Sequence, residues 1–158
     1  MSLDETIPTG SEFRAVKAGK DLPVPPNEQQ RLAALHRYNI LDAPAEPDFD
    51  NLVTLAAQLA GVPVAMISLM DHDRQWFLAK TGVPLTQTPR EIAFCAHTIL
   101  NTVPVMVNDL RFDDRFSTNP LVVNDPHVVF YAGVPLVTPD GFVIGTVCLL
   151  HTQFHALR

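Results

Sequence analysis

The sequence predicts an α+β domain in which helices pack on an antiparallel sheet. Two runs rich in β-branched and aromatic residues within 128–150 meet at Asp140-Gly141, and an Asp-Gly turn between such runs is a strong hairpin signal. A polar stretch of seventeen residues, 110–126, precedes the hairpin, and an amphipathic segment that begins at Thr88 precedes that stretch. A sheet, a helix across it and a long loop can enclose a ligand pocket, so these observations also predict a binding site.

The size and composition of the chain are those of one globular domain. It has 158 residues, 47% of them hydrophobic, and a net charge of −6 without a clustered basic stripe. Neither nucleic acid nor an anionic membrane is therefore expected as a direct partner. No apolar run approaches the roughly 20 residues that span a bilayer, and no signal peptide opens the chain. Cys95 and Cys148 lie far apart in unlike contexts, so we expect no disulfide framework and a cytoplasmic location.

The chain divides into two parts. Residues 1–26 carry turn-forming residues without sustained periodicity and are predicted to form a flexible leader. Residues 27–158 are predicted to form the domain. The sequence ends about where another helix would begin, so we expect the C-terminal helix to be truncated.

Two helices are predicted to open the domain. The first should begin at Asn27, which has the spacing of a capping box with Gln30, and should end before Pro44. The second should begin with Asp48 as its cap and end at Gly61.

A hairpin, a third helix and a short strand are predicted next. Residues 64–70 and 75–80 read as two strands joined by a tight turn. Thr88 and Glu91 form a second capping box with proline at the first helical position, which predicts a helix. Residues 103–107 form a short strand near an edge of the sheet.

This order of elements and several local strings resemble the GAF domain family, and within it a bacterial signalling subgroup. The resemblance covers residues 28 to about 150. The matching segments are residues 31–42, 49–52, 68–71, 74–77, 89–97, 114–116, 119–122, 130–136 and 145–148.

The resemblance implies a five- or six-stranded antiparallel sheet with the first two helices on one face. The ligand cavity should lie on the other face, under the third helix and the long loop. Such domains sit in histidine kinases, diguanylate cyclases, phosphodiesterases and transcription regulators, and they commonly dimerise through terminal helices. A homodimer is therefore expected here.

Two residues of the third predicted helix attract attention. Cys95 lies on its apolar face, so it is predicted to be a buried, inert thiol. His97 points about 200° away, so the pair cannot share a metal ion. His97 shares its face with Phe94, the face that would look toward the pocket in a GAF domain. The alternative is a hydrogen-bonded structural histidine.

The long loop alternates charges with aromatic residues. Asp109, Arg115 and Phe116 could belong to a lid over the pocket, in which an arginine holds an anionic ligand. The alternative is that ion pairs and aromatic anchors merely keep a long loop ordered.

Aromatic residues on the strands complete the candidate site. Strand alternation sends Trp76 and its neighbour Phe77 to opposite faces of the sheet, and Phe130 and Tyr131 separate in the same way. Gly133 lies within the same strand as Tyr131, where a missing side chain often marks a close backbone approach. The predicted ligand-binding residues are Trp76, Phe94, His97, Asp109, Arg115, Phe116 and Tyr131.

No catalytic constellation is found. The sequence has no nucleophile elbow, phosphate-binding glycine loop or zinc-protease helix. Asp71, His72 and Asp73 crowd one turn, which is a common composition without metal. No catalytic residue, metal or cofactor is therefore predicted. Free methionine-(R)-sulfoxide reductase, a stand-alone GAF enzyme, is disfavoured because no cysteine lies near residues 127–133, and a covalent bilin is disfavoured because residues 125–127 lack one.

The predicted function is that of a regulatory sensor. The domain would bind an unknown small molecule and relay its state through terminal helices to an output domain of the same polypeptide. The alternative is a ligand-free dimerisation or spacer module whose interior is filled by its own side chains.

Overall fold

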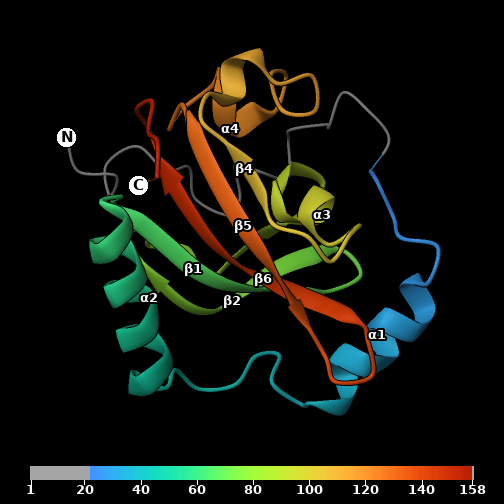
Figure 1. The fold of residues 1–158 in the computed structure, drawn as a ribbon. Helices are drawn as coiled ribbons and strands as arrows, with labels where there is room; N and C mark the ends of the chain where they lie inside the picture. The colour runs from blue at the N-terminus through green and yellow to red at the C-terminus, as the bar shows by residue number, and fades with distance from the viewer. Residues whose placement is uncertain (1–21, 158) are drawn as a thin grey trace.

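The computed structural model describes residues 22–157, so most of the predicted leader lies outside the described residues. The helices are α1 (Glu28–Arg37), α2 (Pro47–Ala60), α3 (Cys95–Thr98) and α4 (Pro120–Val123), with 3-10 turns η3 (Arg90–Ile92) and η4 (Leu110–Phe112). The strands are β1 (Val64–Met70), β2 (Arg74–Thr81), β3 (Gln87–Pro89), β4 (Val105–Val107), β5 (Phe130–Val137) and β6 (Val143–His151). Figure 1 shows the two long helices on one side of a curved sheet and the short helices on the other.

The strands form one antiparallel sheet of six in the order β3-β2-β1-β6-β5-β4. The α+β class is confirmed, and the sheet has six strands. The hairpin of β5 and β6 turns at Asp140-Gly141 as predicted, with Gly141 at a φ of 92° that suits glycine. The hairpin of β1 and β2 is also confirmed.

The two faces of the sheet carry separate parts of the core. Ala34 and Leu35 of α1 pack with Trp76, and Val53 and Ala57 of α2 pack in a neighbouring cluster, all on one face. The larger cluster lies on the opposite face, beneath α3 and the loop that contains α4. A helix layer thus closes one face, and a short helix with a long loop closes the other (Figure 1).

The starts of the first two helices differ from the predictions. Asn27 has φ −98° and ψ 27°, and its side chain makes no capping hydrogen bond, so the capping box with Gln30 does not form. α2 begins one residue before Asp48, with Pro47 in its first turn and Glu46 at the cap position. A proline suits the first turn because it has no amide hydrogen to satisfy. The predicted end at Gly61 is confirmed, with a left-handed φ of 70°.

The helix predicted from Thr88 was wrong. Thr88 lies in β3 opposite Gln75 of β2, and its buried hydroxyl accepts a hydrogen bond from the Gln75 amide at 3.2 Å. Strand pairing satisfies the backbone here, and regular helix is confined to the four residues of α3. The strand predicted from residue 103 begins at Val105. Within residues 22–157, no helix is long and apolar enough to cross a membrane.

Candidate functional site: an uncharged cavity with a thiol pair

A cavity lies between the sheet and the segments that cover its second face. β1, β2, β5 and β6 form its floor, and the segment before α3 and the α4 loop form its walls. Its lining residues are Met66, Gln75, Phe77, Val83, Leu85, Thr88, Ala93, Phe94, Cys95, Leu121, Pro126, Val128, Tyr131, Cys148 and Leu150. No lysine, arginine, histidine, aspartate or glutamate is among them.

The cavity is small. Its volume is about 60 Å³, enough for a few water molecules. It therefore suits a compact molecule of a few heavy atoms, and a nucleotide would require the walls to open.

Gln75 supplies the most telling polar group of the lining. Its side chain is buried, and its Nε2 donates to the Thr88 hydroxyl. Its Oε1 is also buried and has no hydrogen-bond partner. A buried carbonyl without a partner costs about 1–3 kcal/mol. A ligand with an N–H or O–H donor would remove this cost, so the cavity offers one specific polar contact within an apolar surface.

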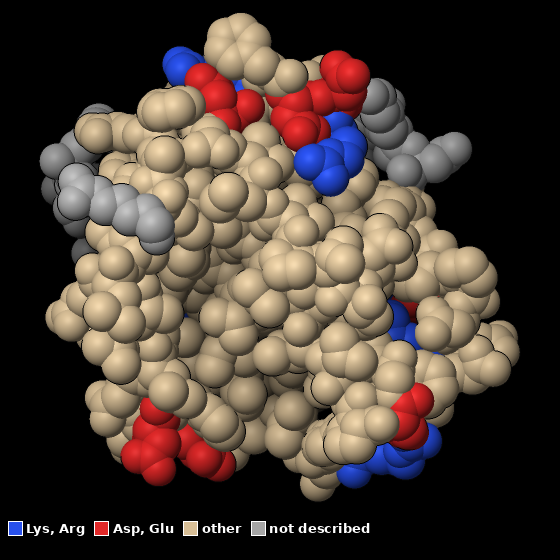
Figure 2. All heavy atoms as spheres, in the orientation of Figure 1, with Lys and Arg blue, Asp and Glu red and all other residues tan. Residues whose placement is uncertain are grey.

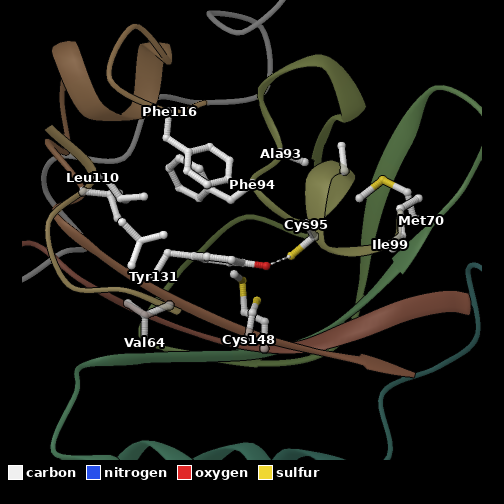
Figure 3. Close-up of a cluster of buried hydrophobic side chains, with 14 of the residues drawn as sticks. Val64, Met70, Ala93, Phe94, Cys95, Ile99, Leu110, Phe116, Tyr131 and Cys148 are labelled. Carbon is white, nitrogen blue, oxygen red and sulfur yellow. Dashed lines mark hydrogen bonds between the residues drawn. The ribbon is translucent and has the colours of Figure 1, made fainter. Parts of the chain in front are cut away.

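A cluster of sulfur and hydroxyl groups lies at another part of the lining. The Tyr131 hydroxyl and the Thr146 hydroxyl donate to Cys95 Sγ at 3.3 and 2.9 Å. The Thr98 hydroxyl lies 2.6 Å from the Tyr131 hydroxyl, which leaves Tyr131 free to donate toward sulfur. Figure 3 shows the Tyr131 hydroxyl directed at Cys95, with Cys148 beside them.

The two thiols are neighbours with opposite acid strengths. Burial raises the pKa of Cys95, but hydrogen bonds from Cys148, Thr146 and Tyr131 outweigh it and hold that pKa below its ordinary value. Sharing a hydrogen bond with Cys95 and being buried raise the pKa of Cys148 well above its ordinary value. Burial beside the two sulfurs also raises the pKa of Tyr131, which keeps its hydroxyl a proton donor.

Gly133 makes room for the tyrosine. A Cβ at Gly133 would collide with the Tyr131 hydroxyl and crowd the Thr98 hydroxyl. The close approach predicted at Gly133 is therefore made by the side chain of Tyr131, which lies two residues earlier on the same strand.

Three of the predicted site residues belong to this part of the core. Phe94 and Tyr131 line the cavity, and Phe116 packs against them with ring centroids 5.4 and 6.2 Å away. His97 lies outside the lining, with its ring 4.9 Å from that of Phe116. Phe94 and Cys95 therefore both line the cavity, whereas His97 lies beside Phe116 and is not among the lining residues.

The charged loop residues lie away from the lining. Arg111 pairs with Asp109 and Arg115 pairs with Asp113, at 2.7 and 2.9 Å. The Arg115 guanidinium also lies 5.0 Å from the ring centre of Phe116. Figure 2 shows charged atoms gathered at the top of the molecule and at its lower edges, with an uncharged middle between them. Asp109 and Arg115 thus form ion pairs within the loop, as expected if these charges serve to keep the loop ordered.

Trp76 lies on the opposite face of the sheet from the cavity, packed under α1. Strand alternation is as predicted, but it brings Phe77 rather than Trp76 to the lining. The sequence-based set also missed Gln75 and Cys148. Gln75 could have been found as the one polar side chain that shares a face with Phe77. Cys148 could not have been found in this way, because nothing in the local sequence indicates that it lies near Cys95 in the fold.

A buried ionic cluster joins α1 to the segment that leads into the cavity wall. Glu28 bonds Arg31 of its own helix at 2.8 Å and also pairs with Arg90 of η3. Both guanidiniums are almost fully buried and donate to backbone carbonyls of the strand ends and the turn that joins β1 to β2. Three residues after Arg90, Ala93 begins the stretch of cavity lining that includes Phe94 and Cys95.

The described residues contain no group of histidine, cysteine and acidic side chains that could hold a metal ion. The crowded turn after β1 instead holds Asp71 in hydrogen bonds with Arg74 and His36. This turn is therefore occupied by its own ion pairs.

Comparison with known proteins relates this chain to a protein family. The family model of the GAF domain matches residues 45–157. Over 131 residues, the chain is 38% identical to a cyclic di-GMP phosphodiesterase of Pseudomonas aeruginosa, a match that covers 83% of this chain and 22% of that protein. The chain therefore spans less than a quarter of the length of this curated relative.

Solved structures share the fold at low sequence identity. The GAF domain of an Acinetobacter phosphoenolpyruvate-protein phosphotransferase superposes with a TM-score of 0.54 at 20% identity, covering 80% of this chain and 79% of that one. A type II free methionine-R-sulfoxide reductase from Thermoplasma acidophilum gives 0.56 at 12% identity, covering 78% and 82%. Such distant likenesses show the fold alone.

Proposed function

Because the chain belongs to the GAF domain family, we propose that it is a regulatory sensor domain of a bacterial signalling protein, placed in the cytoplasm, that binds a small molecule in the cavity described above. The unpartnered, buried Oε1 of Gln75 carries this proposal. A cavity that served only as packing would have little reason to hold a polar atom at such a cost.

The lining defines the class of ligand. A small, neutral and largely apolar molecule with one hydrogen-bond donor fits both the lining and the unpartnered Gln75 carbonyl. Phosphate groups are normally held by arginine, lysine or helix N-termini. Since no cationic side chain lines the cavity, we do not expect a cyclic nucleotide to be the ligand.

The route to an output domain starts at α1. Glu28 connects this helix to Arg90, and Arg90 lies directly before the residues that form the cavity wall. A ligand that moves the wall would therefore change the position of a terminal helix. We propose that this shift regulates an output domain elsewhere in the same polypeptide, and that this region itself acts as a regulator rather than a catalyst.

We further propose that the domain forms a homodimer through α2. Leu52, Leu55 and Leu59 are more than half exposed and follow one another at spacings of three and four residues. That spacing makes a helical seam that can pair with a second copy of itself, as coiled-coil positions do. Leu55→Lys should convert a dimer to a monomer in light scattering, with Gln58→Lys on the same helix as the control. A monomeric wild type, or a dimer unaffected by the leucine substitution, would contradict this surface.

The ligand proposal is tested by native mass spectrometry and thermal shift. Wild-type protein should retain a small neutral ligand or gain thermal stability from one in a metabolite screen. Gln75→Leu should abolish that gain while leaving the free protein folded, and Gln153→Leu at an exposed site should preserve it. If no neutral compound stabilises the wild type, the spacer function is favoured. If charged nucleotides do so, the assigned ligand class is wrong.

A further inference from the structure

Two thiols that are 53 positions apart in the chain meet in the cavity lining. Cys95 lies at the start of α3 and Cys148 on β6; both belong to one core cluster, and Figure 3 shows them next to each other. Both are free, buried thiols and both line the cavity, so a molecule in the cavity can reach them. Cys95 is buried, as predicted, but two hydroxyl groups donate to its sulfur, which does not favour an inert thiol.

We propose that Cys95 and Cys148 form a reversible disulfide when a small, neutral hydroperoxide enters the cavity, with Cys95 as the attacking sulfur and Cys148 as the resolving thiol. This redox site is a second input to the domain, and it shares the cavity and the Gln75 carbonyl with the sensor ligand proposed above.

The surroundings of Cys95 favour a nucleophilic sulfur. The hydroxyl groups of Tyr131 and Thr146 both donate to Cys95 Sγ. Donors that converge on one sulfur stabilise its thiolate, and the thiolate is the form that attacks peroxides. Cys148 has the opposite character and remains protonated, which suits a thiol that acts second.

The cavity selects the oxidant by charge and size. A free amino acid sulfoxide carries a carboxylate and an ammonium group, and neither would find an opposite charge in this lining. Hydrogen peroxide and small alkyl hydroperoxides are neutral and fit the available volume. Their O–H can donate to the free Oε1 of Gln75, which gives the unpaired carbonyl a partner.

The reaction balances without a further reagent. The Cys95 thiolate attacks the terminal oxygen of the hydroperoxide, the O–O bond breaks, and the leaving alkoxide or hydroxide takes up the proton that the thiol lost. Cys95 becomes a sulfenic acid and the peroxide is reduced to an alcohol or water. Cys148 then attacks the Cys95 sulfur, the S–S bond forms, and the sulfenic oxygen leaves as water with the Cys148 proton. A cellular thiol reductant reverses the change.

Titration of the native 158-residue chain with hydrogen peroxide and with tert-butyl hydroperoxide tests the proposal. Intact mass should fall by about 2 Da, and digestion under non-reducing conditions should yield a linked pair of peptides that contain Cys95 and Cys148. Dithiothreitol should restore the original mass. A stable gain of about 16 or 32 Da at either cysteine, a link between two chains, or no change in the folded protein would overturn the proposal.

Variants separate the roles of the two sulfurs. Cys148→Ala should stop at a gain of about 16 Da on Cys95, whereas Cys95→Ala should remain unoxidised under the same conditions. Tyr131→Phe keeps the ring and removes one donor, so oxidation should slow about tenfold, the effect of one pKa unit on the thiolate fraction. Oxidation of Cys148 in Cys95→Ala would reverse the assignment. Equally rapid disulfide formation with free methionine-(R)-sulfoxide would refute the selection of a neutral oxidant.

Discussion

Removal of the Glu28 carboxylate should destabilise the fold. The carboxylate lies between two guanidiniums, those of Arg31 and Arg90, each about 1% exposed, while Glu28 itself is 15% exposed. Glu28→Gln keeps the shape of the side chain but leaves two buried cations without a negative partner. Breaking a buried ion pair from one side typically costs about 3–5 kcal/mol.

The pKa of Glu28 gives an independent magnitude. Burial raises this pKa, but the hydrogen bonds and charges of Arg31 and Arg90 outweigh burial and lower it from 4.5 to about 2. Each pKa unit corresponds to about 1.4 kcal/mol, so the ionised carboxylate favours the folded state by about 3 kcal/mol. Because the folded-state pKa is the lower one, this contribution is complete above about pH 5 and disappears as the pH falls toward 2.

Chemical denaturation of wild type and Glu28→Gln should therefore show a pH-dependent difference. The free energies of unfolding should differ by about 3 kcal/mol at pH 7 and by about half of that at pH 3. The exposed Glu91, replaced in the same way, serves as the matched control and should change stability by less than about 0.5 kcal/mol. A Glu28→Gln difference below about 1 kcal/mol, or one that does not change with pH, would refute the assigned role of the ionic cluster.

Two further substitutions test the cavity wall and its cover. Phe116→Ala should lower the free energy of unfolding by about 3–5 kcal/mol, because the ring is fully buried among aromatic partners. Phe112 lies in the same loop but is 83% exposed, so Phe112→Ala should be nearly neutral in chemical denaturation. Equal effects of the two substitutions would show that the loop is not anchored by Phe116. Gly133→Ala should lower the free energy of unfolding by about 1–3 kcal/mol, because the new Cβ must displace the Tyr131 hydroxyl. Thermal melting would measure the loss of stability, and ultraviolet absorption would report the change around Tyr131. An unchanged melting temperature would mean that the tyrosine can move away at no cost.

Local sequence patterns predicted the elements whose causes are local. The Asp140-Gly141 turn, the end of α2 at Gly61 and the hairpin of β1 and β2 depend on turn chemistry and alternation within a few residues. The sequence also predicted that helices would pack in a layer on the sheet, because two amphipathic helices and a half-buried sheet have few ways to cover each other.

Predictions failed where a distant segment competes with a local signal. Thr88 has the pattern of a helix cap, yet pairing with Gln75 across two strands gives its backbone and hydroxyl better partners. The expected caps are also missing. Asn27 lacks the extended backbone conformation that a capping residue usually adopts, and α2 already begins at Pro47, one residue before Asp48.

The sequence by itself determined that Trp76 and Phe77 occupy opposite faces of the sheet, because successive side chains on a strand point to opposite faces. Which face receives the cavity was decided by tertiary packing, since α1 covers one side and α3 with its loop covers the other. The same packing decided the chemistry of the site. Cys95, Cys148 and Gln75 come from separate elements, and only the closed fold brings two sulfurs and an unpaired carbonyl into one uncharged cavity.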